Sequence, residues 1–204
     1  MLGIIVLAGG DEDTVPSPAR PSASATGWQE YHGVRLPLSA ADGPRATGDD
    51  LASGFARTQP GALLAVLHIA VRANAQWGPA VFDPTITRQV IGTDQQALMT
   101  ATHDLYERSR TEAGLPPGSS LGDVYVVYEA YRWQSYTPDA ATVDIVSAGP
   151  TPSGGTVRAS TRIQVRWQDG DWRVVAPLGG DWGNTATQVT SLEGYTRLDV
   201  GMRG

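Results

Sequence analysis

The chain has 204 residues, 41% of them hydrophobic, and a formal net charge of −6 at pH 7. This length allows one core of useful size, and the acidic balance argues against bulk nucleic-acid binding through a basic surface. There is no cysteine, which excludes disulfides, thiolate metal sites and a lipidated cysteine anchor. All 15 cationic side chains are arginine, a bias typical of proteins from GC-rich genomes.

The N-terminal segment combines a short apolar run with an acidic and then a proline-rich stretch. Residues 1–8 are mostly aliphatic but are far fewer than the roughly 20 residues that span a bilayer. Three acidic residues follow at positions 11–13, where cytoplasmic flanks would favour Lys and Arg. We therefore expect the end of a truncated membrane anchor over residues 1–8 and a disordered extracytoplasmic stalk over residues 9–27. The alternative is a mobile N-terminus with chance aliphatic residues on a soluble cytoplasmic protein.

Three helices are predicted after an irregular lead-in over residues 28–59. The first covers residues 62–77 behind an N-cap at Thr58, and it is apolar on almost every side, so we expect it to be buried. The second runs to residue 91 from Pro84, with Asp83 as its cap. The third begins at a capping box that Thr93 forms with Gln96 and ends near residue 114.

Beyond residue 118 the hydrophobic period changes from helical to alternating. This pattern predicts strands over residues 124–136, 142–147, 156–168 and 171–176. Asp169-Gly170 supplies a type I′ turn between the last two strands, so that Trp167 faces Trp172 across the hairpin and both lie on the core face. The tail over residues 179–204 is expected to be loop, with residues 187–192 returning to the domain surface.

This order of elements predicts one α+β domain over residues 28–200, with about three N-terminal helices packed on a curved four-stranded antiparallel sheet. The order, together with the hairpin V-R-W-Q-D-G-D-W-R-V-V of residues 165–175, is similar to the nuclear-transport-factor-2-like cone fold over residues 55–177. Within that fold the chain most resembles membrane-tethered assembly proteins of conjugation and type IV secretion, and similar actinobacterial accessory proteins. The resemblance implies a scaffold role.

Two groups of polar residues in the predicted helices are candidates for chemistry. His68 and Arg72 interrupt the apolar first helix one turn apart, and a cone pocket containing them could serve a small-molecule binder or a lyase- or isomerase-type enzyme. The alternative is a hydrogen-bonded, inert histidine. His103 and Asp104 are adjacent on the third helix and point about 100° apart, so they do not form a dyad by themselves.

The arginines of the predicted hairpin form the other candidate site. Arg158, Arg162 and Arg166 recur on one face of one strand, and Arg173 should lie opposite Arg166. Such a surface suits docking of an acidic partner or a second subunit. The alternative is a solvated face on which Glu129 or Asp144 of adjacent strands partly neutralises the arginines.

No spacing of metal ligands, no phosphate-binding glycine loop and no nucleophile elbow occurs in the sequence, so we predict no metal and no cofactor. The resulting hypothesis is a non-enzymatic, membrane-tethered, extracytoplasmic assembly subunit of a cell-envelope transfer machine. It would contact other subunits and possibly itself, and it would not bind nucleic acid.

Overall fold

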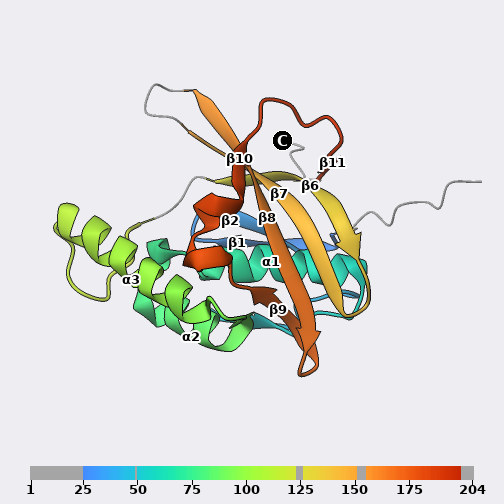
Figure 1. Cartoon of the computed structure of the whole chain (residues 1–204), viewed down its shortest axis with the longest axis horizontal. Helices are drawn as coiled ribbons and strands as arrows, with labels where there is room; N and C mark the ends of the chain where they lie inside the picture. Colours follow the sequence, from blue (N-terminus) through green and yellow to red (C-terminus); the bar gives the residue numbers. More distant parts are fainter. Residues whose placement is uncertain (1–24, 49, 123–125, 151–154, 199–204) are drawn as a thin grey trace, which may run out of the picture.

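The computed structural model describes residues 25–48, 50–122, 126–150 and 155–198. In this part of the chain, three α-helices precede the long strands in sequence: α1 (Gln59–Arg72), α2 (Pro79–Gln89) and α3 (Gln95–Glu112). Figure 1 shows α1 lying between the long strands and the N-terminal hairpin, while α2 and α3 lie together at one end. The class is α+β, as the order of elements predicts.

The main sheet has seven strands in the described residues. The order is β11-β6-β7-β8-β9-β5, and β10 pairs with β8 off this path. All pairings are antiparallel except that of β5 with β9, which is parallel. The strands are β5 (Val90–Ile91), β6 (Val127–Tyr136), β7 (Ala140–Pro150), β8 (Thr156–Gln168), β9 (Asp171–Val175), β10 (Ala186–Gln188) and β11 (Thr196–Arg197).

The predicted four-stranded antiparallel sheet is therefore wrong in strand number and in pairing. The four expected strands exist as β6 to β9, but three more join them. β5, β10 and β11 have only two or three residues each, which is too short for an alternating pattern to be visible in the sequence. They are strands because distant segments supply their hydrogen-bond partners. The tail expected as loop thus contributes two strands to the sheet.

Two small hairpins occupy the segment that the sequence suggested was irregular. β1 (Gly27–Tyr31) pairs with β2 (Val34–Leu38), and β3 (Ala46–Thr47) pairs with β4 (Ala52–Ser53). The turn of the first hairpin uses His32 and Gly33, which have φ of 48° and 85°. Two consecutive positive φ values are the signature of a type I′ turn. Because β1 and β2 pair directly, this segment is an ordered layer of the domain.

The β8–β9 hairpin has the predicted register. Gln168 pairs with Asp171, Trp167 with Trp172 and Arg166 with Arg173. Trp172 is fully buried and Trp167 is partly buried against the same core, with ring centroids 5.5 Å apart. The prediction of a type I′ turn fits Asp169 and Gly170, whose φ values are 52° and 79°.

The helix boundaries agree with the sequence in part. Thr58 caps α1 as predicted and accepts a hydrogen bond from the backbone N–H of Gly61. α1 stops at Arg72, however, and Trp77 belongs to a separate 3₁₀ turn over Ala75–Trp77. α2 begins at Pro79 and contains Pro84, so Asp83 is not its cap. The N-cap of α3 is Asp94, without a capping side-chain bond, so the predicted capping box is wrong.

The apolar helix α1 is enclosed on all sides, as its composition predicts. It packs against β7, β8 and β9 of the main sheet, and also against β2, β4 and α2. Eleven of its residues are buried: Gly61, Ala62, Leu63, Leu64, Ala65, Val66, Leu67, His68, Ile69, Val71 and Arg72. The N-terminal hairpins therefore complete the core, since the sheet alone covers one face of this helix.

None of the described helices is long and apolar enough to cross a membrane. The predicted anchor over residues 1–8 and most of the predicted stalk lie outside the described residues, and both stay predictions.

Asp171 at the start of β9 ties the sheet to the segment that leads into α1. Its carboxylate accepts hydrogen bonds from the backbone N–H groups of Gly54 at 2.9 Å and Phe55 at 3.1 Å. It also accepts from the N–H of Trp172 at 2.9 Å, while the Trp172 indole donates to the carbonyl of Ala56 at 2.9 Å. Two adjacent residues thus hold the entry to α1 against the last long strand.

Replacing Asp171 by Asn should destabilise the fold. The carboxylate serves three backbone donors, two of them more than 100 residues away in sequence, and an amide has one acceptor oxygen instead of two. We expect a loss of about 3 kcal/mol in the free energy of unfolding, measured by urea denaturation. Asp104→Asn is the matched control, because Asp104 is exposed on α3. Equal effects of the two substitutions would contradict the role assigned to Asp171.

Candidate functional site

The predicted arginine surface lies on the outer face of the sheet, away from α1. Two of its members, both on β8, are paired with acidic residues of the adjacent strand β7 and of β6, the strand beyond it. Arg158 hydrogen-bonds both carboxylate oxygens of Glu129 on β6, at 2.6 and 3.1 Å. Arg162 does the same with Asp144 on β7, at 2.8 and 3.3 Å. The partial neutralisation by Glu129 and Asp144, considered from the sequence as the alternative, is therefore present in the structure for these two arginines.

Asp144 is the centre of the outer-face network and is only 3% exposed. Besides Arg162, it accepts hydrogen bonds from Arg132 at 3.0 Å and from Gln134 at 2.7 Å. Burial acts against the charge of Asp144, but the hydrogen bonds from Arg162, Arg132 and Gln134 outweigh it and hold the pKa of this carboxyl below its usual value. Two guanidinium groups thus share one ionised carboxylate.

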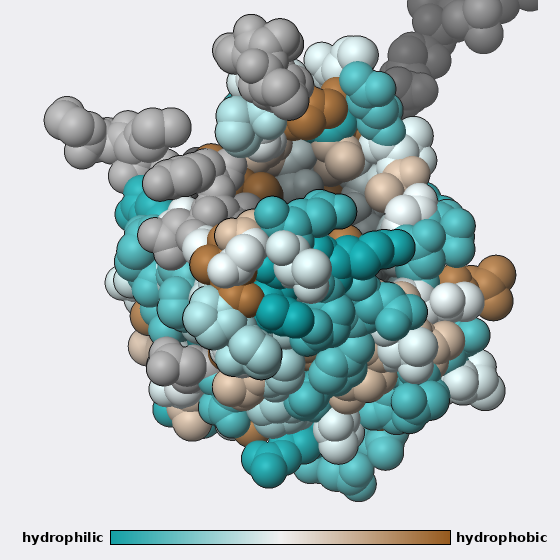
Figure 2. Space-filling model, turned by 90° about the vertical axis from the view of Figure 1, so that its left-hand side faces the viewer, coloured by the Kyte–Doolittle hydropathy of each residue, from teal (hydrophilic) through white to brown (hydrophobic). Residues whose placement is uncertain are grey.

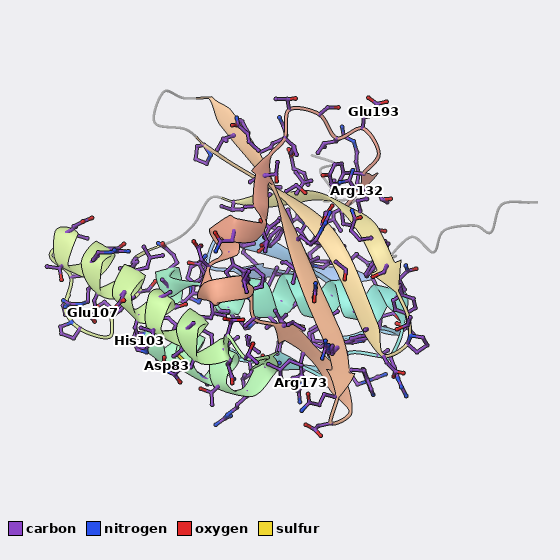
Figure 3. All side chains as sticks on the ribbon, viewed as in Figure 1. Asp83, His103, Glu107, Arg132, Arg173 and Glu193 are labelled. Atoms are coloured by element: carbon purple, nitrogen blue, oxygen red, sulfur yellow. The ribbon has the colours of Figure 1, made fainter. Side chains whose placement is uncertain are left out.

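The other two predicted arginines form a like-charged pair across the β8–β9 hairpin, near its turn. Arg166 and Arg173 are directly opposite in the register of β8 and β9. Arg173 approaches Asp171 at 3.7 Å with a side chain that is 18% exposed. Arg166 is exposed, and the described residues offer it no ion pair. The predicted arginines therefore do not converge on one point: Arg158 contacts Glu129, Arg162 contacts Asp144, and Arg173 lies near Asp171. Figure 3 shows Arg173 at the end of the sheet opposite to Arg132.

The C-terminal segment covers part of the outer face, and residues 186–198 are named the C-terminal arch. It is attached through β10 on β8 and β11 on β6. Tyr195 of the arch donates its hydroxyl proton to Ser160 at 3.0 Å, and its ring lies under the guanidinium of Arg132 at 4.4 Å. Figure 3 shows Arg132 beneath this arch and Glu193 on its outer loop.

A pocket of about 470 Å³ lies beside the C-terminal arch, here called the arch pocket. Arg132 and Arg162 line it, with only the carboxylate of Asp144 to balance them, so the formal charge of its wall is positive. The remaining lining is polar or small: Ser160, Asn184, Thr185, Thr187, Val189 and Tyr195. A positive wall with hydroxyl and amide groups is suited to an anionic group such as a carboxylate.

His68 and Arg72 are fully buried and are directed at the N-terminal hairpin. The Nε2–H of His68 donates to the carbonyl of Pro37 at 2.9 Å, and Arg72 donates to His68 Nδ1 at 3.3 Å. Arg72 also donates to the carbonyl of Gly48 and lies over the Tyr31 ring at 4.1 Å. These contacts fasten two N-terminal segments to α1. Neither residue is among those that line the pocket beside the C-terminal arch.

The remaining histidines contact aromatic rings. His103 pairs with Asp83 of α2 at 2.8 Å instead of with its neighbour Asp104, and its ring meets Phe82 edge-on. Figure 3 shows Asp83 and His103 between α2 and α3. His32 stacks on Trp77 with ring centroids 5.0 Å apart. Within the described residues, no group of three or more His, Cys, Asp or Glu is placed to hold a metal ion.

A second pocket, the inner pocket, lies on the opposite side of the sheet, between α1 and the strands. Its volume is about 170 Å³. The lining comes from α1 and the residue that caps the next turn, from β6, β7 and β8, and from the 3₁₀ turn η3 (Trp182–Thr185): Ala70, Asn74, Tyr128, Ile145, Ser147, Thr161, Ile163 and Trp182. No charged side chain is among these residues.

The sequence interpretation missed Arg132, Tyr195 and Trp182 as pocket residues. The alternation of β6 could have placed Arg132 beside Asp144, but a bulge between Tyr128 and Ala130 changes which face each residue takes. Tyr195 and Trp182 come from the tail, which has no period to reveal that it returns to the sheet. Their positions depend on pairings of two and three residues.

One family model, described as a domain of unknown function (DUF8175), matches residues 7–197. The match covers most of the chain, so the protein belongs to this family. A comparison with curated proteins finds no match, and a comparison with solved structures finds none either. The resemblance to the nuclear-transport-factor-2-like fold and to conjugation proteins therefore stays a prediction.

The buried imidazole predicts a pH-dependent stability. Burial lowers the pKa of His68 from 6.5 to about 4, opposed by the hydrogen bond to Pro37 and aided by the charge of Arg72. Below pH 6.5 the unfolded chain takes up a proton that the folded chain refuses, so stability falls as the pH drops towards 4. This difference in pKa between the unfolded and folded chain corresponds to about 3 kcal/mol in the free energy of unfolding.

Urea denaturation of the wild type and of His68→Gln from pH 7 to pH 4 measures this effect. Gln keeps a side-chain N–H donor for Pro37 and has no titration in this range. Between pH 7 and pH 4, we expect the free energy of unfolding of the wild type to fall by about 3 kcal/mol more than that of the variant. If the free energy of unfolding depended on pH in the same way for both proteins, His68 would not be held neutral by the fold.

Proposed function

We propose that this protein is a non-enzymatic binding domain that acts through contacts with other protein subunits, and that the arginines of its outer face receive an acidic segment of a partner. We further propose that it is an extracytoplasmic assembly subunit of a cell-envelope transfer machine, tethered through its N-terminal segment.

The observation that carries the proposal is the cross-strand pair of Arg166 and Arg173. Like charges directly opposite in an antiparallel ladder destabilise the sheet. The carboxylate of Asp171 lies 3.7 Å from the guanidinium of Arg173 and offsets the charge of that arginine alone. Arg166 is exposed and has no ion pair in the described part of the chain. A carboxylate supplied by a partner would remove this repulsion, so the arrangement favours binding of an acidic group.

The arch pocket supports the same class of partner. Arg132 and Arg162 have side chains that are 43% and 52% exposed, although both contact Asp144. Their remaining N–H groups are available to a second anion, because one carboxylate cannot satisfy two guanidinium groups with five donors each. Since the chain as a whole has a formal charge of −6, these arginines are a local positive region that would orient an acidic partner.

The position of His68 and Arg72 favours a binding role over the enzyme alternative. Both residues use their polar atoms on backbone carbonyls and on each other, inside the core. A general acid–base residue must reach a substrate proton, and these side chains are fully buried against the N-terminal hairpin. The assignment to an envelope machine depends on the resemblance of the hairpin and the element order to conjugation assembly proteins.

Charge reversal at Arg166 tests the acidic-partner proposal. Arg166→Glu should raise the free energy of unfolding by about 0.5 kcal/mol, because it replaces repulsion with attraction opposite Arg173. It should also weaken binding of a deca-glutamate peptide by at least about fivefold, measured by fluorescence anisotropy at low salt. The matched control is Arg88→Glu, the same charge change at an exposed position of α2. An equal loss of binding in both variants, or no binding by the wild type, contradicts the proposal.

The assembly role has its own test. A photo-crosslinking amino acid at position 166, in the full chain expressed in its own cell, should give specific products with subunits of an envelope transfer apparatus. The same amino acid at position 88 should not. Products at both positions, or only with unrelated proteins, would contradict the assignment even if the acidic peptide binds.

A further inference from the structure

The inner pocket is built from residues that meet on the inner face of three neighbouring strands. Tyr128 of β6 is the register partner of Ser147 on β7, and Ile145 of β7 is the partner of Thr161 on β8. Ile145 and Ser147 are two residues apart on one strand, so both point to the same face. These four side chains therefore form two adjacent rows beneath α1.

Three hydroxyl groups in this pocket make no hydrogen bond within the described residues. Those of Tyr128, Ser147 and Thr161 all line the inner pocket, and none of them donates to or accepts from another group in the described residues. None of the three hydroxyl oxygens is among the fully buried side-chain atoms without a partner, so each is open to the pocket, where water or a ligand can bind it. The Nδ2 of Asn74 is equally unengaged, because only its Oδ1 bonds, to the N–H of Gln76. Polar groups without partners thus converge on a small cavity.

Trp182 is the residue of the C-terminal part of the chain that lines the inner pocket. It begins the 3₁₀ turn η3, which follows two consecutive glycines of positive φ, Gly179 and Gly180, and continues with Gly183. The same indole lines two neighbouring pockets of about 450 and 290 Å³, one along α3 and one beside β9. The Trp182 side chain is therefore shared by the inner pocket and both of these neighbours.

The surface around this entrance does not have the character of a broad docking face. Figure 2, which faces the α3 end of the molecule, shows mainly hydrophilic residues with small separate hydrophobic areas. The exposed large hydrophobic residues of the described chain are single ones, Leu105, Val127, Val157 and Leu178. Scattered apolar residues need no partner, whereas a cavity with converging polar groups is the usual form of a small-molecule site.

The chemistry of the lining defines the ligand. There is no charged side chain, so a buried ionic group would lack compensation. Burial raises the pKa of Tyr128 to about 12, and its phenol stays a neutral donor at physiological pH. Ile145, Ile163 and the indole of Trp182 supply apolar contact. The volume is close to that of a cavity known to accept benzene, about 150 Å³.

We propose that the inner pocket is a binding site for a small neutral molecule with an apolar, ring-sized body and one amide, carbonyl or hydroxyl group, held by the hydroxyls of Tyr128, Ser147 and Thr161 beneath Trp182. The site lies on the opposite side of the sheet from the arginines and is independent of the proposed partner surface.

Three molecules of nearly the same shape test the site: benzamide is neutral, benzoate is anionic and benzamidine is cationic. Titration of the full chain, followed by NMR chemical shifts of the tryptophan indoles, should show saturable benzamide binding. At the inner pocket, followed through the indole of Trp182, benzoate and benzamidine should bind at least about tenfold more weakly, because each would bury an uncompensated charge. A ligand of this size can have a dissociation constant as weak as about 10 mM. The proposal is overturned if benzamide binding does not saturate up to that concentration. It is also overturned if the three molecules bind there with equal affinity.

Substitutions in the pocket locate the binding. The double variant Tyr128→Phe with Thr161→Val keeps the shape of the pocket and removes two hydroxyls, and it should weaken benzamide binding about tenfold. Tyr195→Phe is the matched control, since it removes a tyrosine hydroxyl from the C-terminal arch instead. Benzamide affinity unchanged in the double variant contradicts the site. Arg166→Glu should leave benzamide binding intact, so failure of this proposal and failure of the partner proposal are distinguishable.

Discussion

The enclosure of α1 is the constraint on which the rest of the structure depends. A helix that is apolar around its whole circumference cannot rest on a sheet with one side in water, because the exposed side would retain the cost of hydrating apolar surface. The sheet strands β7, β8 and β9 cover one part of α1, and β2, β4 and α2 cover the rest. The N-terminal hairpins are consequently part of the core, and Asp171 and Trp172 hold the entry of α1 in the position that permits this enclosure.

Enclosure also decides what the polar residues of α1 can do. His68 and Arg72 are the two polar side chains that the buried helix carries into the core, and both find partners among backbone carbonyls of the N-terminal layer. A buried polar group must be hydrogen-bonded, so these contacts attach the hairpin to the helix. The pockets proposed as binding sites are lined by other residues, on the outer face of the sheet and beside the last turn of α1.

On the outer face, nearby acidic residues neutralise some of the arginines and leave Arg166 without an ion pair in the described residues. Arg162 meets Asp144 directly across the β7–β8 pairing, and Arg158 reaches over β7 to Glu129 on β6. Arg166 lies beyond the reach of these acids, opposite another arginine. Exposed ion pairs contribute little stability each, whereas a buried carboxylate such as Asp144 requires its partners. The free charge is concentrated at the end of the hairpin and beside the C-terminal arch.

The sequence by itself determined the α+β class, the burial of α1, the Thr58 cap and the register of the β8–β9 hairpin. Each of these follows from a local signal: a hydrophobic period, a capping residue or an Asp-Gly turn that fixes pairing by counting. Only the tertiary structure decided the seven-stranded mixed sheet, the N-terminal hairpins, the C-terminal arch and the two pockets. β5, β10 and β11 are too short to carry a pattern, and they exist because remote segments supply their hydrogen bonds. Trp182 and Tyr195 became pocket residues for the same reason, since their neighbours in space are distant in sequence.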